Sequence, residues 1–166
     1  IIVITVKLPK LINSNTKSNY GKAIKDKKLG LGAIGIFLYV GAEVAIGSFL
    51  VNYFMDMNMA EVILENNFMH GIASLFHNDI TSIDDKAVVG TFVVVYWGGA
   101  MIGRFVGAYL TRLYKPNKVL SVFAVLAILL VSISMSTAGL VALWSVLAVG
   151  LFNSIMFPTI FSIAIE

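Results

Sequence analysis

Glu43 is the one charged side chain in the apolar stretch of residues 29–54, which is long enough to cross a bilayer as a helix. A carboxylate near the bilayer centre costs about 2.5–3.5 kcal/mol on insertion scales, whereas a leucine there carries no such penalty. We therefore predict that Glu43 faces a water-filled path or another helix. In such a path the carboxylate could accept hydrogen bonds from a polar solute or bind a cation. With a helical period of 3.6, Tyr39 and Gly47 share the face of Glu43.

A second apolar stretch, residues 87–110, carries two aromatic side chains near its middle, Tyr96 and Trp97, and a cation, Arg104, nearer its end. Aromatic rings can pack on the apolar face of a sugar ring. Arg104 could extend to the membrane surface or pair with a buried partner, and the sequence leaves both alternatives open. Glycines recur every four residues around Gly103, and this stripe predicts close helix packing.

A third polar position lies in residues 140–165, where Asn153 is near the middle of the apolar stretch. Its amide can both donate and accept hydrogen bonds, and Phe157 follows one helical turn later. Pro158 lacks an amide proton and crowds the carbonyl of Ser154, so we expect a kink there. Asn153 and Phe157 beside a kink predict a hydrogen-bonding feature of sugar size. Alternatively, Asn153 joins two helices through a hydrogen bond.

The composition is typical of a membrane protein. Of the 166 residues, 58% are hydrophobic and 13% are charged, and the mean hydropathy is +0.90, whereas soluble domains are about 25% charged. Cysteine is absent, which excludes disulfides and cysteine metal sites. His70 and His77 lie among acids, but their spacing fits no metal site, so we expect neither a metal nor an organic cofactor. Nucleotide-binding and catalytic motifs are absent, which predicts that the protein is not an enzyme.

Hydropathy and charge together predict the order of segments. Basic residues dominate the polar stretches 9–28 and 111–118, and acidic residues dominate 55–86. By the positive-inside rule the basic stretches lie in the cytoplasm and the acidic stretch lies outside, as a solvated loop with room for one short helix. A nucleic-acid patch is the rival interpretation of 9–28, but the scarcity of aromatics and the flanking apolar stretches argue against nucleic acid as a partner. The predicted transmembrane segments are the end of a helix at 1–8 and complete helices at 29–54, 87–110, 119–137 and 140–165.

Residues 119–137 are apolar all round, so we expect this helix to face lipid and assign it no chemistry. The chain opens on six largely apolar residues without an initiating methionine and stops after an apolar run. We therefore expect an internal piece of a larger membrane protein, whose remainder is a partner of this chain in the lipid bilayer. Polar groups at mid-depth and a broken helix are typical of transporters. The rival hypothesis is an assembly subunit in which Glu43 pairs with a basic residue of a partner helix.

Three segments of the sequence closely resemble the fucose:proton symporter family of the major facilitator superfamily. They are Phe-Leu-Tyr-Val-Gly-Ala-Glu at 37–43, Gly-Arg-Phe at 103–105 and Gly-Leu-Phe-Asn-Ser-Ile-Met-Phe-Pro-Thr-Ile-Phe-Ser at 150–162. The third segment is long and specific, and the likeness runs from about residue 29 to the end, weakest in the acidic loop. The nearest branch resembles the bacterial glucose/galactose transporters. Fucose-type members tend to carry glutamine at the position of Glu43, which favours the glucose/galactose branch.

The resemblance implies an all-α bundle of twelve helices in the bacterial inner membrane, of which this chain covers the end of helix six and helices seven to ten. It implies uptake of a hexose, coupled to a proton or a sodium ion, by alternating access. Residues 107–118 resemble the superfamily's basic cytoplasmic loop motif, although Thr111 stands where that motif usually has Asp. A fragment of this kind is not expected to transport alone. We assign Tyr39, Glu43, Tyr96, Trp97, Asn153 and Phe157 to substrate binding, and Gly103, Arg104, Arg112 and Pro158 to gating or structure.

Overall fold

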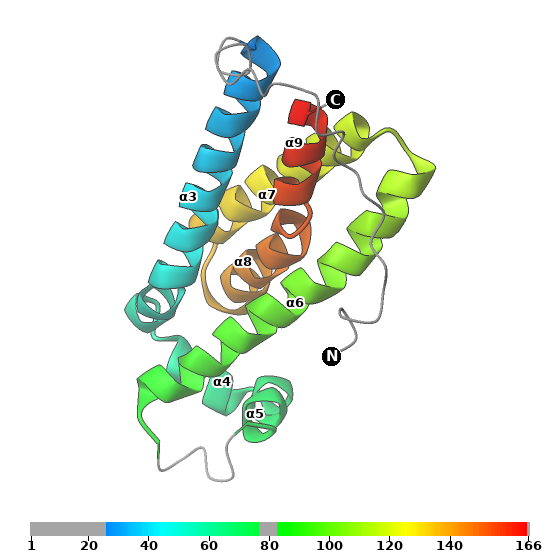
Figure 1. Ribbon diagram of the computed structural model, residues 1–166. Coiled ribbons are helices and arrows are strands. Elements are labelled where there is room, and N and C mark those ends of the chain that lie inside the picture. The colour runs from blue at the N-terminus through cyan, green and yellow to red at the C-terminus, as the bar shows by residue number, and fades with distance from the viewer. Residues whose placement is uncertain (1–25, 77–82, 166) are drawn as a thin grey trace, which may run out of the picture.

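The computed structural model describes residues 26–76 and 83–165, and these residues form helices joined by short turns (Figure 1). Residues 1–8 and nearly all of the basic stretch 9–28 lie outside the described residues, as do residues 77–82 of the acidic stretch, which include His77. The helices are α3 (Lys27–Asp56), α4 (Met59–Glu65), α5 (Asn67–Ser74), α6 (Asp85–Leu113), α7 (Pro116–Ser136), α8 (Gly139–Asn153) and α9 (Met156–Ile165).

Within the described residues the fold is all-α, and 4 helical segments are long and apolar enough to cross a membrane. They are α3, α6, α7 and the combined segment Gly139–Ile165, which contains α8 and α9. The prediction of an all-α membrane fold is therefore confirmed. Lipid offers no hydrogen-bond partners to the backbone, and a helix satisfies its backbone groups internally. A long apolar segment in a bilayer is therefore most stable as a helix.

The ends of the helices follow from local residue chemistry. Asp26 caps α3, because its carboxylate accepts a hydrogen bond of 2.9 Å from the backbone amide of Lys28. Pro116 opens α7 at the position where a helix needs no amide donor. The helix α8 begins at Gly139, directly after the turn from α7, and the φ of +66° at this residue lies in the left-handed region that glycine adopts without strain.

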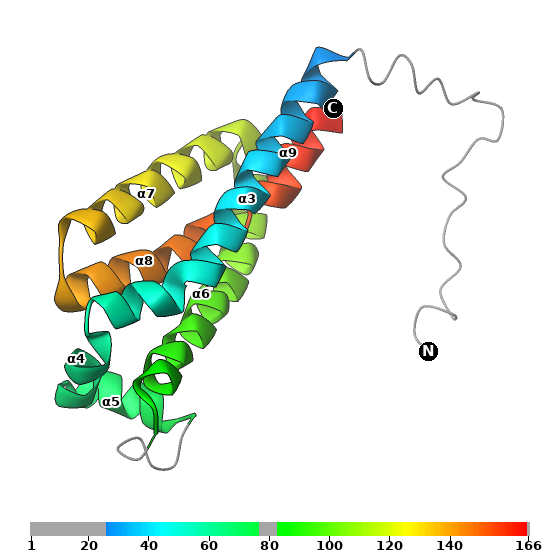
Figure 2. The same ribbon diagram turned by 90° about the vertical axis from the view of Figure 1, so that its left-hand side faces the viewer.

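The helix α8 lies at the centre of the bundle, packed against α6 on one side and α7 on the other. The next helix, α9, packs against α3 and also contacts α7, and Figure 2 shows α3 and α9 side by side. A Cβ atom at Gly32 of α3 would collide with the Cβ of Ala164 of α9, so the glycine allows this close approach. The two halves of the segment Gly139–Ile165 are thus held by different neighbours.

The glycine stripe of α6 lies against α8. A Cβ atom at Gly103 would collide with the carbonyl oxygen of Leu151. In the other direction, a Cβ atom at Gly150 of α8 would lie 2.6 Å from the carbonyl oxygen of Tyr96. Both contacts are to backbone atoms, which cannot rotate away as a side chain can. The short interhelical distance therefore depends on glycine at both positions.

The acidic segment 55–86 differs from its prediction as a solvated loop with at most one helix. It contains two helices, α4 and α5, which pack against α3 and α6. Met59 and Ile63 of α4, and Met69 of α5, are almost fully buried. The prediction was wrong because it weighed the acidic residues and overlooked the apolar ones. Met59 and Ile63 are spaced one helical turn apart and share a buried face.

The helix α7 also differs from the expectation that all of its sides face lipid. Val119, Phe123, Ala127 and Ser134 are buried, and α7 packs along α8. The remaining side of α7 is exposed, as at Ile128. Apolarity all round a helix does not say which side meets a neighbour, so this contact was not readable from the sequence.

Charged residues divide the bundle into two ends. We call the end with the start of α3 and the α6–α7 turn the basic end, and the end with α4 and α5 the acidic end (Figure 2). The basic end carries Lys27, Lys28, Arg112, Lys115 and Lys118. The acidic end carries Asp56, Glu61, Glu65, Asp84 and Asp85.

Candidate functional site

Glu43 lies on α3 and is partly buried, where it lines an open pocket of about 350 Å³ together with Trp97 and Arg104 of α6. Gly47 of α3 also lies beside Trp97, and a Cβ atom at this position would be at an ordinary contact distance of 3.5 Å from the Trp97 ring. The sequence left Arg104 either extended to the surface or paired. The structure leaves its side chain exposed while placing it in the same pocket as the Glu43 carboxylate.

Three further predicted site residues, Tyr39, Tyr96 and Asn153, lie together from three different helices. Their exposed fractions are 8%, 1% and 7%. The Tyr39 hydroxyl lies beside the Glu43 carboxylate, and the side chains of Tyr96 and Arg104 are close enough to interact with it electrostatically. The Tyr96 hydroxyl in turn lies near the Asn153 side chain, but no hydrogen bond joins the two. This connected group, Tyr39, Glu43, Tyr96, Arg104 and Asn153, is called the polar cluster below.

Two atoms of the polar cluster are buried without a hydrogen-bond partner. They are the hydroxyl oxygen of Tyr96 and the Nδ2 of Asn153, and within the described residues no other buried side-chain oxygen or nitrogen lacks a partner. A buried polar atom without a partner costs about 1–3 kcal/mol, so most are paired. Side chains that keep such atoms are suited to exchange hydrogen bonds with a polar solute or with water.

A second pocket, of about 330 Å³, is lined by Tyr39 and Asn153 and lies between α3, α7 and α8. Sequence reasoning missed the contribution of α7, which lines this pocket with Ala124, Ala127, Ile128, Val131 and Ser132. The alanines at 124 and 127 lie on one helical face and were the available signal, since small residues mark a side of a transmembrane helix that meets protein.

The segment after Asn153 is interrupted. The helix α8 ends at Asn153, Ser154 and Ile155 form a turn, and α9 begins at Met156. Pro158 provides the physical reason, because it offers no amide to the carbonyl of Ser154 four residues earlier. The interruption also separates Asn153, which is buried, from Phe157, which is 45% exposed. The joint role of these two residues in a sugar-sized site stays a prediction.

The residues assigned to gating or structure lie toward the basic end. Pro158 and Arg104 line a third open pocket of about 410 Å³, together with Thr111 near the end of α6 and Pro116 at the start of α7. Arg112 is exposed in the last turn of α6, next to Thr111, whose hydroxyl donates to the carbonyl oxygen of Gly107 at 3.1 Å. Within the described residues, no group of three or more histidines or acids is placed to hold a metal ion.

The helical bundle, with 4 segments long and apolar enough to cross a membrane, defines the class of the chain as a multi-pass membrane protein. The chain is 46% identical over 88% of its length to a glucose/galactose transporter of Brucella abortus biovar 1 (strain 9-941). It is 38% identical over 99% of its length to a putative glucose/galactose transporter of Helicobacter pylori (strain ATCC 700392 / 26695). It is 32% identical over 78% of its length to the L-fucose-proton symporter of Escherichia coli (strain K12).

These homologues place the chain in the sugar-transporter branch of the major facilitator superfamily, in the bacterial inner membrane, as the resemblance indicated. The chain spans about a third of the length of the curated relatives it matches, 30% of the first and 35% of the second. All three are named as transporters or symporters rather than enzymes. No protein-family model and no solved structure matches the chain.

Proposed function

We propose that the chain forms part of a secondary active transporter that imports a hexose by cation-coupled symport with alternating access. The names of the relatives support glucose or galactose as the substrate, with fucose as a further candidate from the more distant symporter. The remainder of the transporter and the lipid bilayer are the partners of this chain. Since half of a pathway cannot alternate between two sides, the chain by itself is expected to be inactive.

The polar cluster is the observation that carries this proposal. A hexose loses hydrogen bonds to water when it leaves solution, so its hydroxyl groups need donors and acceptors in return. Glu43 offers acceptors, Asn153 and the two tyrosines offer both, and Trp97 offers a flat apolar surface for the ring face. The pocket beside Glu43, at about 350 Å³, falls in the range of about 300–1,000 Å³ that is usual for small-molecule sites.

The interruption between α8 and α9 supports alternating access. The two helices on either side of it have different neighbours. The helix α8 packs against α6 and α7, whereas α9 packs mainly against α3. A helix without a continuous hydrogen-bond ladder bends at its break more easily than elsewhere. Asn153 lies at that break, so a change of angle there would change its position relative to Glu43 on α3.

Uptake of labelled hexose by the full-length protein tests the proposal with two variants. Glu43→Gln keeps the size of the side chain and removes its charge, and Asn153→Ala removes the amide. Each is expected to reduce uptake at least about tenfold at low sugar concentration, which corresponds to about 1.4 kcal/mol of lost interaction. Ser121→Ala is the control, because Ser121 is exposed on α7 and bonds only to the carbonyl oxygen of Asn117. Normal uptake with unchanged apparent affinity in both variants would refute the roles of Glu43 and Asn153.

The same variants separate the two functions proposed for Glu43. If Glu43 binds the coupling cation, the residual uptake of Glu43→Gln no longer depends on the ion gradient. If Glu43 binds the sugar alone, the gradient dependence persists and only the apparent affinity falls.

The alternative function is an assembly subunit in which Glu43 pairs with a basic residue of a partner helix. The open side of the pocket beside Glu43 is the observation that favours it. Under this alternative, Glu43→Gln releases the partner from the membrane complex in a pull-down, and hexose uptake is absent even in the unmodified protein.

A further inference from the structure

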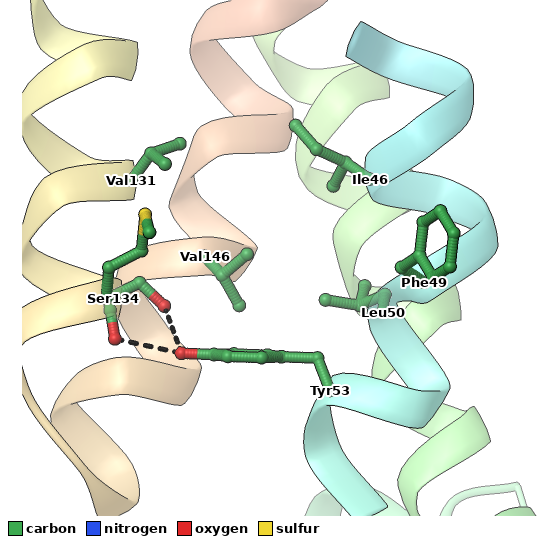
Figure 3. Close-up of a pocket in the computed structure, with 8 residues that line it drawn as sticks. Ile46, Phe49, Leu50, Tyr53, Val131, Ser134 and Val146 are labelled. Atoms are coloured by element: carbon green, nitrogen blue, oxygen red, sulfur yellow. Dashed lines mark hydrogen bonds between the residues drawn. The ribbon is translucent and has the colours of Figure 1, made fainter. Parts of the chain in front are cut away.

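Tyr53, near the acidic end of α3, extends across the bundle to the end of α7 (Figure 3). Its hydroxyl donates to the carbonyl oxygen of Ser134 at 2.8 Å and lies 2.9 Å from the Ser134 hydroxyl. The Ser134 hydroxyl also donates to the carbonyl oxygen of Ala142 on α8 at 2.9 Å. Two side chains therefore connect three helices through residues that are 81 and 8 positions apart in the sequence.

The end of α7 explains why this contact is needed. The last carbonyl groups of a helix have no amide partner within the helix, and in an apolar environment they must find one elsewhere. At the end of α7, the hydroxyl of Thr137 donates to the carbonyl oxygen of Ile133 at 2.7 Å. The neighbouring carbonyl of Ser134 receives its hydrogen bond from Tyr53 instead. Tyr53 is thus a helix cap for α7 that is supplied by another helix.

A count of hydroxyl protons shows that the two side chains contribute unequally to this contact. The hydroxyls of Tyr53 and Ser134 carry one proton each, and three short contacts compete for these two protons. Removal of the Ser134 hydroxyl still allows Tyr53 to donate to the Ser134 carbonyl. Removal of the Tyr53 hydroxyl leaves that carbonyl without this donor. The tyrosine is therefore expected to matter more than the serine.

The surroundings of Tyr53 connect this contact to the polar cluster. An apolar pocket of about 180 Å³ lies around the contact, between α3, α7 and α8 (Figure 3). Two of its residues, Ile46 and Val131, also line the pocket that contains Tyr39 and Asn153. The two pockets therefore adjoin along the gap between α3 and α7, and the Tyr53–Ser134 contact bridges this gap near its acidic end.

We propose that Tyr53 and Ser134 form a latch that fixes α3 to the α7–α8 turn and closes this gap from the acidic end. The latch holds Tyr39 and Glu43, which are on α3, in register with Asn153, which is on α8. Tyr53 is a positioning residue, because it acts through the placement of α3 and does not reach the polar cluster. The geometry of the latch stands without the proposed function, and only its effect on sugar affinity rests on that function.

Labelling of a single cysteine at Ile46 tests the latch in the full-length protein, with any cysteines of the remaining chain replaced. A membrane-impermeant maleimide is added from the side of the acidic end. We expect Ile46→Cys to react slowly with Tyr53 present and several-fold faster in Tyr53→Phe. The expected rate for Ser134→Ala lies between these values, and Ser134→Thr, which keeps the hydroxyl, reacts at the unmodified rate. A cysteine at Ser74, which is exposed on α5, is the control and keeps one rate throughout.

An equal rate at Ile46→Cys with Tyr53 and with Tyr53→Phe overturns the proposal. If Tyr53→Phe does not accumulate in the membrane, the comparison of Ser134→Ala with Ser134→Thr decides, because equal rates in that pair overturn it as well. In uptake measurements, Tyr53→Phe is expected to raise the apparent KM for hexose several-fold and to change Vmax less than twofold. Labelling requires no sugar, so an effect on labelling in a protein without hexose uptake refutes the proposed function and leaves the latch.

Discussion

At the residue scale, the polar cluster keeps two buried atoms without partners in a bundle that otherwise satisfies its polar groups. Ser134, Ser154 and Thr159 are also buried, and the side-chain hydroxyl of each donates to a backbone carbonyl oxygen. The Tyr96 hydroxyl and the Asn153 Nδ2 differ from them. Each buried polar atom without a partner lowers the stability of the fold by about 1–3 kcal/mol. Such a loss of stability is typical of binding sites, where function requires polar atoms that are free to bind a ligand.

The unpaired amide of Asn153 predicts the effect of replacing this residue by leucine. Leucine removes the buried amide and keeps a similar volume, so we expect Asn153→Leu to gain about 1 kcal/mol of stability in a thermal unfolding assay. Its hexose uptake is expected to fall at least about tenfold. The opposite pattern, a clear loss of stability, would show that Asn153 joins two helices as the sequence also allowed.

At the element scale, the close approach of α6 and α8 places Tyr96 beside Asn153. Glycines carry this approach from both sides, at Gly103 of α6 and at Gly150 of α8. In a bilayer, apolar side chains gain little by leaving lipid, so helices associate through close contact of small residues. The geometry of the polar cluster therefore depends on residues that do not belong to it.

Gly103→Ala tests this dependence. The added methyl group collides with the carbonyl oxygen of Leu151, so α6 and α8 must separate. We expect a loss of about 1–3 kcal/mol of stability, measured by thermal unfolding in detergent. Gly98→Ala is the matched control on the same helix, since nothing lies within 4 Å of a Cβ atom there and alanine favours helix. Equal stability of the two variants would contradict the packing argument.

At the scale of the whole molecule, charge separates the two ends of the bundle. The basic end carries the α6–α7 turn with Lys115 and Lys118, and the acidic end carries α4 and α5. Positive charge near the ends of spanning helices is retained in the cytoplasm, so this separation predicts the orientation of the chain in the membrane. In this orientation the latch at Tyr53 faces the outside.

Cysteine accessibility checks the orientation in intact cells. Ser74→Cys on α5 is expected to react with an impermeant maleimide added outside. Asn117→Cys in the first turn of α7 is expected to react only after the cells are permeabilised. Both positions are exposed, so a difference in reactivity reports the side of the membrane. Labelling of Asn117→Cys in intact cells would contradict the predicted orientation.

The sequence by itself determined the class of the protein and its spanning helices. Long apolar stretches leave no stable alternative to helix in lipid, because the bilayer offers no partners to the backbone. The spacing of Glu43, Tyr39 and Gly47 placed them on one face, and Pro158 indicated a break before it. Each of these inferences uses residues within one or two turns of each other, where helical geometry is known in advance.

Only the tertiary structure decided which helix faces meet. The pairing of Tyr53 with Ser134 joins residues 81 positions apart. The pocket that α7 lines together with α3 and α8 likewise brings together segments that are distant in the sequence. The helices α4 and α5 and the separation of Asn153 from Phe157 also became visible only there. Local periodicity states which side of a helix is small or polar, but the neighbour of that side depends on how all the helices pack at once.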